Sequence, residues 1–199
     1  MLDATEFNKQ RKVLDRQNME YIAGGTFMMG SDKFYPEEKP VHKATVDGFW
    51  MDKYLVTNKA FSEFVSATNY VTVAERPLNP AEFPTIPEEN LSPGSMVFRK
   101  RDGPVDLKDY KNWWRWMKGA CWKHPEGPGS TIIGLEDHPV VHIAFEDAEA
   151  YAKWKGKELP TEAEWEFAAR GGLDGMDFTW GNEDTQLTKP KANTWQGEF

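Results

Sequence analysis

Two histidines stand four residues apart in this 199-residue chain, a spacing at which two imidazoles on one helix face can share a metal ion. His138 and His142 are separated by Pro139 and the β-branched pair Val140–Val141, which favours an extended segment over a helix. In an extended chain, at about 3.3 Å per residue, the two rings lie about 13 Å apart, too far to bind one ion. We therefore expect structural hydrogen bonding from these rings.

The single cysteine, Cys121, lies three residues before His124, and a neighbouring histidine can activate a thiol as a nucleophile. A free cysteine is more often a small buried apolar residue, and the adjacent Trp122 favours that interpretation. One cysteine excludes an intramolecular disulfide and cannot by itself build a thiolate zinc site. The chain also has no phosphate-binding glycine loop and no nucleophile elbow, so the residues alone indicate no catalytic apparatus.

The charge balance excludes two classes of partner. The chain has 24 basic and 32 acidic residues, a net charge of −8, which argues against sequence-independent binding to nucleic acid or to an anionic membrane. No window has the apolar length of a membrane span, and the N-terminus lacks a signal-peptide pattern, so we expect a cytoplasmic protein. Aromatic residues make up 14% of the chain, which predicts a core built from large side chains.

The N-terminal half shows local signals for strands. Residues 1–18 are interpreted as a polar lead-in, and an ordered domain is expected over residues 19–199. Residues 41–46 and 49–54 are strand-like runs joined by Asp47–Gly48, which predicts a two-residue hairpin.

Helix boundaries are predicted from capping residues. Thr57 begins a helix whose inward face carries Phe61 and Phe64, and a second helix ends at Gly156. A third begins at a capping box formed by Thr161 and Glu164, and it ends at Gly171.

The remaining segments are assigned as follows. Residues 77–104 contain six prolines and are expected to be a long irregular loop, whereas residues 140–145 are expected to be a buried strand. The acidic residues within 146–149 and 162–166 are assigned to solvated helix faces and caps.

Several runs, in their order along the chain, resemble the formylglycine-generating enzyme family, also called the sulfatase-modifying factors, and its bacterial members in particular. Each run is weakly informative alone, but their joint order and spacing are highly specific, and the resemblance extends from residue 19 to residue 199. The runs are Ile22–Gly30, Met51–Asn58, Phe64–Val65, Thr72–Leu78, Trp113–Trp114 through His124–Pro128, Asp137–His142, Leu159–Glu166 and Ala192–Gly197.

The resemblance implies an oxidase that converts the cysteine of a sulfatase Cys-x-Pro-x-Arg motif to formylglycine, using O2 and a copper ion held by two cysteines. It implies an α+β fold, irregular and loop-rich, similar to C-type lectin domains. It also implies a bound calcium ion, with ligands from Asn193 and Thr194 and from residues beyond Phe199. The implied partner is a sulfatase polypeptide.

The resemblance also implies a truncation. The catalytic cysteine pair of the family lies near the C-terminal end of its domain, so we expect residues 19–199 to be about two thirds of a domain. Cys121 matches neither position, and a single thiolate cannot hold a cuprous ion in the way that the pair does. We therefore expect this chain alone to be inactive and the missing C-terminal part of the domain to be its partner.

Two other functions stay open. The lectin-like scaffold also serves as a non-catalytic binding module, and a related domain occurs in iron-dependent sulfoxide synthases. Those synthases carry a helical domain with a histidine-rich iron motif, and this sequence contains neither. A continuation of the coding sequence with two nearby cysteines would favour the oxidase.

The substrate surface is implied by the same resemblance. A sulfatase peptide is expected to lie extended in a groove walled in part by the stretch after Tyr70, with Ala74, Glu75, Trp113 and Trp114 as candidates. The Glu75 carboxylate could meet the arginine of the motif. Core packing is the alternative role of these residues; we expect it for Trp114, and it stays open for Trp113.

Overall fold

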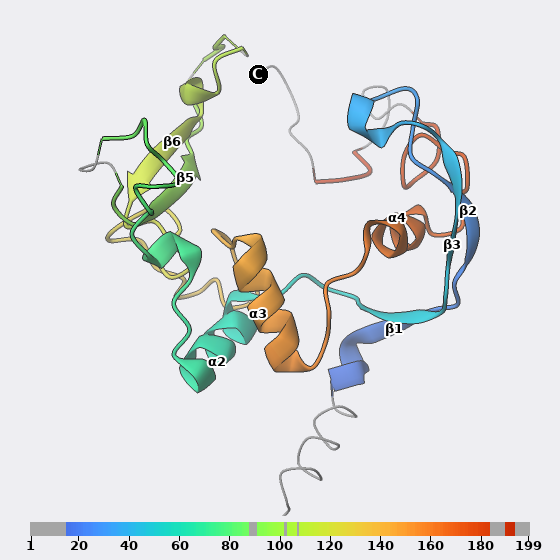
Figure 1. Cartoon of the computed structure of the whole chain (residues 1–199), viewed down its shortest axis with the longest axis horizontal. Helices are drawn as coiled ribbons and strands as arrows, with labels where there is room; N and C mark the ends of the chain where they lie inside the picture. The colour runs from blue at the N-terminus through green and yellow to red at the C-terminus, as the bar shows by residue number, and fades with distance from the viewer. Residues whose placement is uncertain (1–14, 88–90, 102, 107, 184–189, 194–199) are drawn as a thin grey trace, which may run out of the picture. The chain divides into compact units, whose positions relative to one another are not determined.

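The computed structural model describes residues 15–87, 91–101, 103–106, 108–183 and 190–193 (Figure 1). Within them the chain forms two compact units: residues 15–54 with 159–193, and residues 55–158. The described residues contain three α-helices and six short strands joined by long irregular segments, which agrees with a loop-rich α+β class. The C-type-lectin-like fold stays a prediction.

The first unit contains two small antiparallel sheets. Strand β1 (Met19–Ile22) pairs with β4 (Phe49–Asp52), and β2 (Gly25–Met29) pairs with β3 (His42–Val46). The 3₁₀ turn η1 (Asp15–Asn18) directly precedes β1.

The hairpin predicted across residues 47–48 is wrong. Both runs are strands, but they belong to different sheets, because each finds its partner nearer the N-terminus. The Thr26 and Thr45 hydroxyls form a 2.8 Å hydrogen bond across one sheet, and the Tyr21 and Trp50 rings lie 5.3 Å apart across the other. Such cross-strand contacts, rather than the turn residues, select the pairing.

Helix α4 (Glu162–Arg170) packs against the β2–β3 sheet. The rings of Phe27 and Phe167 meet edge to face at 5.3 Å, and Phe27 is buried. The predicted capping box at Thr161 is confirmed, and so is the stop at Gly171, which adopts a φ of 56°. Segments from the two ends of the described chain therefore build one unit together.

The second unit is built around a cluster of aromatic side chains. Helices α2 (Asn58–Thr68) and α3 (Phe145–Lys155) contact one another, and Phe61, Phe64 and Trp122 form its buried centre. The Thr57 hydroxyl accepts a hydrogen bond from the N–H of Ala60, so the predicted start of α2 is confirmed.

The buried strand predicted over residues 140–145 is wrong. Pro139 makes an isolated bridge to Thr57, His142 has a φ of 59°, and α3 already begins at residue 145. The reason is a cap: the Asp147 carboxylate accepts a hydrogen bond from the N–H of Ala144 at 2.9 Å and starts the helix. The predicted end at Gly156 is confirmed, with a φ of 69°.

The proline-rich stretch is only partly irregular. It contains strand β5 (Gly94–Phe98), which pairs antiparallel with β6 (Trp114–Lys118), so the expected loop over residues 77–104 is wrong at its C-terminal end (Figure 1).

Trp114 is 40% exposed, which corrects the expectation that it packs in the core.

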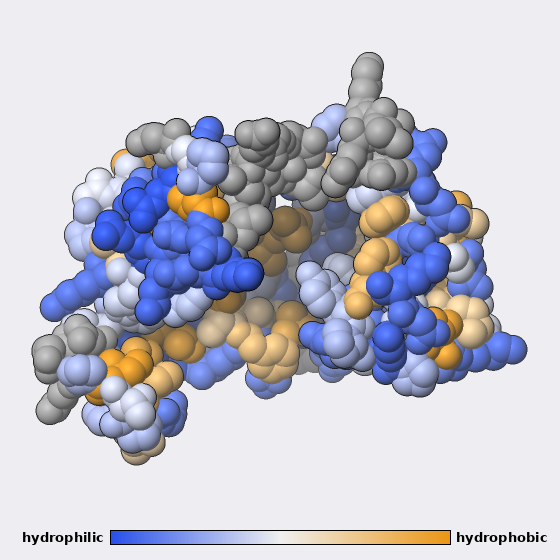
Figure 2. Space-filling view, turned by 90° about the horizontal axis from the view of Figure 1, so that it is seen from above, coloured by the Kyte–Doolittle hydropathy of each residue, from blue (hydrophilic) through white to orange (hydrophobic). Residues whose placement is uncertain are grey.

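Hydrophobic residues reach the surface beside hydrophilic ones in the face shown in Figure 2. Among the described residues, no helix combines the length and the apolar character needed to cross a membrane.

Candidate functional site

A cleft of about 840 Å³ opens in the first unit. Its walls come from two segments that are distant in sequence, residues 28–42 and residues 162–180. The volume lies in the range of ligand-binding clefts. Its aromatic lining residues are Phe34, Tyr35, Trp165, Phe178 and Trp180.

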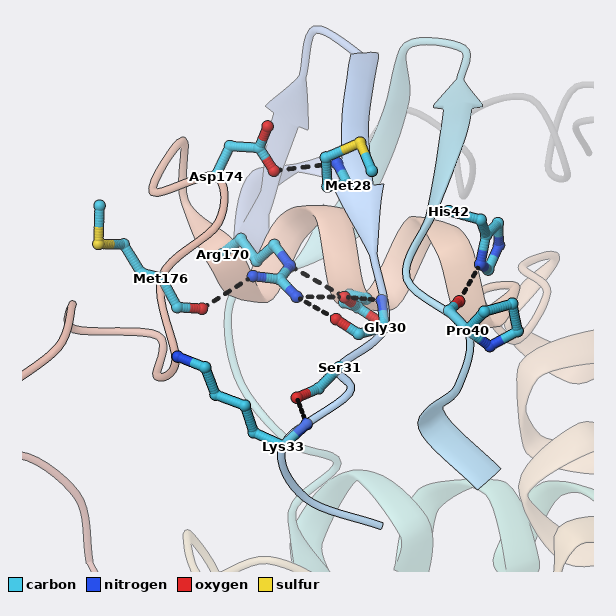
Figure 3. Close-up of polar contacts among 10 residues, drawn as sticks. Met28, Gly30, Ser31, Lys33, Pro40, His42, Arg170, Asp174 and Met176 are labelled. Atoms are coloured by element: carbon cyan, nitrogen blue, oxygen red, sulfur yellow. Dashed lines mark hydrogen bonds and ion pairs between the residues drawn. The ribbon is translucent and has the colours of Figure 1, made fainter. Parts of the chain in front are cut away.

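One wall of the cleft is held by a polar network around Arg170 (Figure 3). Glu166 Oε1 accepts hydrogen bonds from the N–H of Gly30 at 2.9 Å and from Arg170 Nη2 at 2.6 Å. Arg170 also donates to the carbonyls of Met176 at 3.1 Å and Gly30 at 3.3 Å. The guanidinium therefore contacts three groups, the Glu166 carboxylate and the carbonyls of Gly30 and Met176. These contacts join α4 to the end of β2 and to the loop after α4.

The rim of the cleft adds two further links between the same segments. Asp174 accepts a hydrogen bond from the N–H of Met28 at 2.9 Å, and both residues are drawn in Figure 3. Lys33 Nζ lies 2.6 Å from the carboxylate of Asp177. These contacts hold the two walls in place, and no local sequence pattern indicates them because the paired residues lie more than 140 positions apart.

Two of the predicted substrate-binding residues lie on a short 3₁₀ turn in the second unit, η3 (Val73–Glu75). Glu75 Oε2 accepts hydrogen bonds from the Thr72 hydroxyl at 2.8 Å and from its N–H at 3.2 Å, and Glu75 Oε1 lies 2.9 Å from Lys123 Nζ. Burial raises the pKa of Glu75, but the hydrogen bonds from Lys123 and Thr72 outweigh it, so this pKa lies below its ordinary value. The carboxylate is already engaged, and Ala74 is buried.

Asp147 of α3 holds the start of the same turn. Its side chain is fully buried, and Oδ1 accepts hydrogen bonds from the N–H of Val73 at 3.0 Å and the Tyr70 hydroxyl at 3.1 Å. Burial and this hydrogen bond to Asp147 raise the pKa of Tyr70. The assignment of Asp147 to a solvated face is therefore wrong, although the assignment to a cap is confirmed. Its place at the third position of α3 is the signal that the sequence offered.

The other two predicted residues are on the hairpin of the second unit. Trp113 follows the 3₁₀ turn η5 (Tyr110–Asn112) and is half-buried, and Trp114 begins β6 with its ring 5.6 Å from that of Phe98. Strand β5 contacts η3, so the hairpin and the turn with Ala74 and Glu75 lie in one region of the unit.

The histidines and the cysteine have structural positions. His142 Nδ1 lies 2.8 Å from the Ser95 hydroxyl and its Nε2 lies 2.7 Å from the Pro125 carbonyl, which confirms the expected hydrogen bonding for this ring. For His138 it stays a prediction. Cys121 is buried, as expected, and its backbone pairs with that of His124. No cluster of three His, Cys, Asp or Glu side chains that could hold a metal ion occurs within the described residues.

The described residues do not fit the metals that the resemblance implies. Copper held by a cysteine pair needs two thiolates, and the sequence has one buried cysteine. Calcium takes six to eight oxygen ligands. Asn193 is exposed and offers one side-chain oxygen, and Thr194 lies outside the described residues.

Comparison with known proteins shows the family to which the chain belongs. A family model, the sulfatase-modifying factor enzyme 1-like domain, matches residues 4–199. The chain belongs to this family.

Its relatives include named enzymes. It is 53% identical to a formylglycine-generating enzyme of Mycobacterium tuberculosis over 178 residues, which are 89% of this chain and 59% of that protein. It is 40% identical to the bovine formylglycine-generating enzyme over 183 residues, 89% of this chain and 46% of that protein. It is also 40% identical to the murine inactive C-alpha-formylglycine-generating enzyme 2 over 185 residues, 91% of this chain and 55% of that protein. The chain thus spans about half to three fifths of these relatives.

Proposed function

We propose that this chain is part of a formylglycine-generating enzyme, which oxidises the cysteine of a sulfatase Cys-x-Pro-x-Arg motif to formylglycine with O2. The observation that carries the proposal is the 53% identity to the mycobacterial enzyme over nearly the whole chain. The chain supplies a binding surface and part of the scaffold, and the copper-binding cysteine pair comes from outside residues 1–199.

The substrate surface that we propose is the region of η3 and the β5–β6 hairpin. Trp114 is 40% exposed and Trp113 is half-buried, so both rings can contact an extended peptide. Glu75 contributes a carboxylate whose lowered pKa keeps it ionised at neutral pH. Ala74 is buried beside it, so its part in the surface is to support the turn that carries Glu75.

An arginine of the motif would have to share Glu75 with Lys123, which already lies 2.9 Å away. We propose that peptide binding displaces Lys123 Nζ, whose side chain is half-exposed. The Glu75 side chain is only 19% exposed, so its carboxylate needs a cation beside it, and the arginine of the peptide would replace the charge that Lys123 supplies.

Calcium binding and cytoplasmic location are further parts of the proposal. Asn193 and Thr194 supply two of the calcium ligands, and the remainder come from residues outside this chain. Asn193→Ala in the protein that the whole gene encodes is then expected to lower the melting temperature in calcium but not in chelator.

The test is the reaction itself. The protein encoded by the complete gene is incubated with copper, O2 and a Cys-x-Pro-x-Arg peptide, and the cysteine is followed by mass spectrometry. Formylglycine is the expected product, with none from the 199-residue chain. An unmodified cysteine in the presence of the complete protein would contradict the proposal.

A second candidate function is non-catalytic binding of a polypeptide. The observation that favours it is the 40% identity to the murine relative named as inactive, which equals the identity to the bovine enzyme. A complete gene without two neighbouring cysteines, together with binding of the peptide and no product, would select this function.

A further inference from the structure

We infer that the cleft of the first unit binds a cationic side chain, an arginine or lysine presented by a bound polypeptide. The choice of a polypeptide as the carrier rests on the proposed function. The cationic chemistry rests on the cleft, whose lining residues all belong to the first unit.

The first argument is a row of aromatic rings. Phe178 stacks on Trp180 with ring centroids 5.0 Å apart and an interplanar angle of 7°, and Phe34 lies 5.9 Å from Phe178. Tyr35 and Trp165, which also line the cleft, are 68% and 62% exposed. Aromatic faces attract guanidinium and ammonium groups through the ring quadrupole, and tryptophan does so most strongly.

The second argument is charge. Six carboxylates line the cleft against three Lys or Arg side chains and one histidine. Two of the six are neutralised internally, Glu166 by Arg170 and Asp177 by Lys33. Within the described residues no cation pairs with the other four, which are Asp32, Glu37, Glu38 and Glu162. The cleft therefore keeps a negative field beside exposed aromatic faces.

The third argument concerns the kind of cation. These carboxylates do not gather into a cluster able to hold a metal ion in the described part of the chain. They are distributed along a cleft of about 840 Å³, which is wider than a single ion and accommodates a long side chain with its neighbouring residues. A planar guanidinium can stack on one ring and donate hydrogen bonds to a carboxylate at its edge.

The test uses isosteric peptides and isothermal calorimetry with the 199-residue chain. One hexapeptide carries two arginines among alanines and glycines, and the other carries citrulline at the same positions. Citrulline keeps the shape of arginine and removes the charge. We expect the arginine peptide to bind at least tenfold more tightly, and its affinity to fall as NaCl is raised from 50 to 500 mM.

Two variants locate the site. Trp165→Ala and Glu162→Gln alter exposed side chains of α4 and are each expected to weaken the arginine peptide about three- to tenfold. Their matched controls in the second unit lie on α3: Phe145→Ala, at a ring that is 75% exposed, and Glu149→Gln, at an exposed carboxylate. Both controls are expected to leave the affinity unchanged.

Equal binding of the arginine and citrulline peptides would overturn the inference, as would no binding at millimolar concentration. Equal loss in the α4 variants and their controls would overturn it too. The proposed function is judged separately, because Glu75→Gln is expected to weaken a Cys-x-Pro-x-Arg peptide without changing the arginine hexapeptide. Binding of the hexapeptide without binding of the Cys-x-Pro-x-Arg peptide would support the cleft and contradict the proposed substrate surface. Binding of the Cys-x-Pro-x-Arg peptide without binding of the hexapeptide would support the substrate surface and overturn the inference about the cleft.

Discussion

The carboxylate of Glu166 accepts a hydrogen bond from the backbone N–H of Gly30 at 2.9 Å, joining residues that are 136 positions apart. The same oxygen receives Arg170, so one side chain ties α4 to the end of β2 and orients the cation that holds the next loop. Together with the contacts Met28–Asp174 and Lys33–Asp177, this link joins the two walls of the cleft in the first unit.

Glu166→Gln tests that link. The amide oxygen can still accept from Gly30, but the charge that holds Arg170, whose side chain is only 16% exposed, is lost. We expect the free energy of unfolding to fall by about 1–2 kcal/mol in urea titrations. Glu149→Gln, in an exposed pair with Lys153, is expected to cost less than about 0.5 kcal/mol. Equal costs would show that the network carries no special stability.

Asp147→Asn tests the second unit. The buried carboxylate accepts hydrogen bonds from two backbone N–H groups and one hydroxyl, and an amide must turn its NH₂ toward at least one of these donors. We expect a loss of about 2–4 kcal/mol in the free energy of unfolding, measured by urea titration. Glu146→Gln is the control, because Glu146 pairs with Arg76 at the surface and is expected to contribute under about 1 kcal/mol.

Features set by neighbouring residues in the chain could be predicted from the sequence, whereas the burial of Glu166 and Asp147 could not. Capping signals at Thr57, Thr161 and Gly171 predicted helix ends because a cap is satisfied by residues within one turn. The strand runs were found, but their partners were not, since pairing is decided by contacts between distant segments. Glu166 and Asp147 each have one local partner, Arg170 and the N–H of Ala144, which the helix spacing indicates. Their burial depends on distant partners, Gly30 for Glu166 and Tyr70 and Val73 for Asp147, and no local pattern indicates those.

Two residues of the candidate site, Glu75 and Trp113, were predicted from the sequence, and both lie in the second unit. The three-residue spacing of Thr72 and Glu75 is that of a capping box, so the bond between them has a local signal. The ion pair with Lys123 has none, because Lys123 lies 48 positions further along the chain. The cleft of the first unit was missed altogether, since its walls are residues 28–42 and 162–180, which only folding brings together.

Gly24→Ala tests the turn between β1 and β2. Gly24 has a φ of +75°, and a Cβ there would lie 2.6 Å from the carbonyl oxygen of Val46, a backbone atom that cannot move aside. We expect a loss above about 3 kcal/mol, by calorimetric or urea unfolding. Gly172→Ala separates the two causes, because its φ is +86° but nothing lies within 4 Å of the added Cβ. That control is expected to cost only about 1–2 kcal/mol.

Glu75 should leave a signature in the pH dependence of stability. Its folded pKa lies below the ordinary value of 4.5, so the ionised form stabilises the fold above that pH. This contribution is lost as the pH falls through the lower folded pKa. Glu75→Gln is therefore expected to lose less stability than the parent chain between pH 6 and pH 3, and Lys123→Met should be intermediate. Parallel curves for all three proteins would contradict the assignment.

The proposed function requires the turn with Glu75 and the hairpin with Trp113–Trp114 to bind a sulfatase peptide. The most direct measurement is photocrosslinking of a Cys-x-Pro-x-Arg peptide that carries a benzophenone beside the arginine, followed by mass spectrometry of the crosslinked fragments. The account predicts crosslinks within residues 70–76 and 110–118, reduced by competition with unlabelled peptide. Crosslinks confined to other segments, or crosslinks that unlabelled peptide does not reduce, would contradict it.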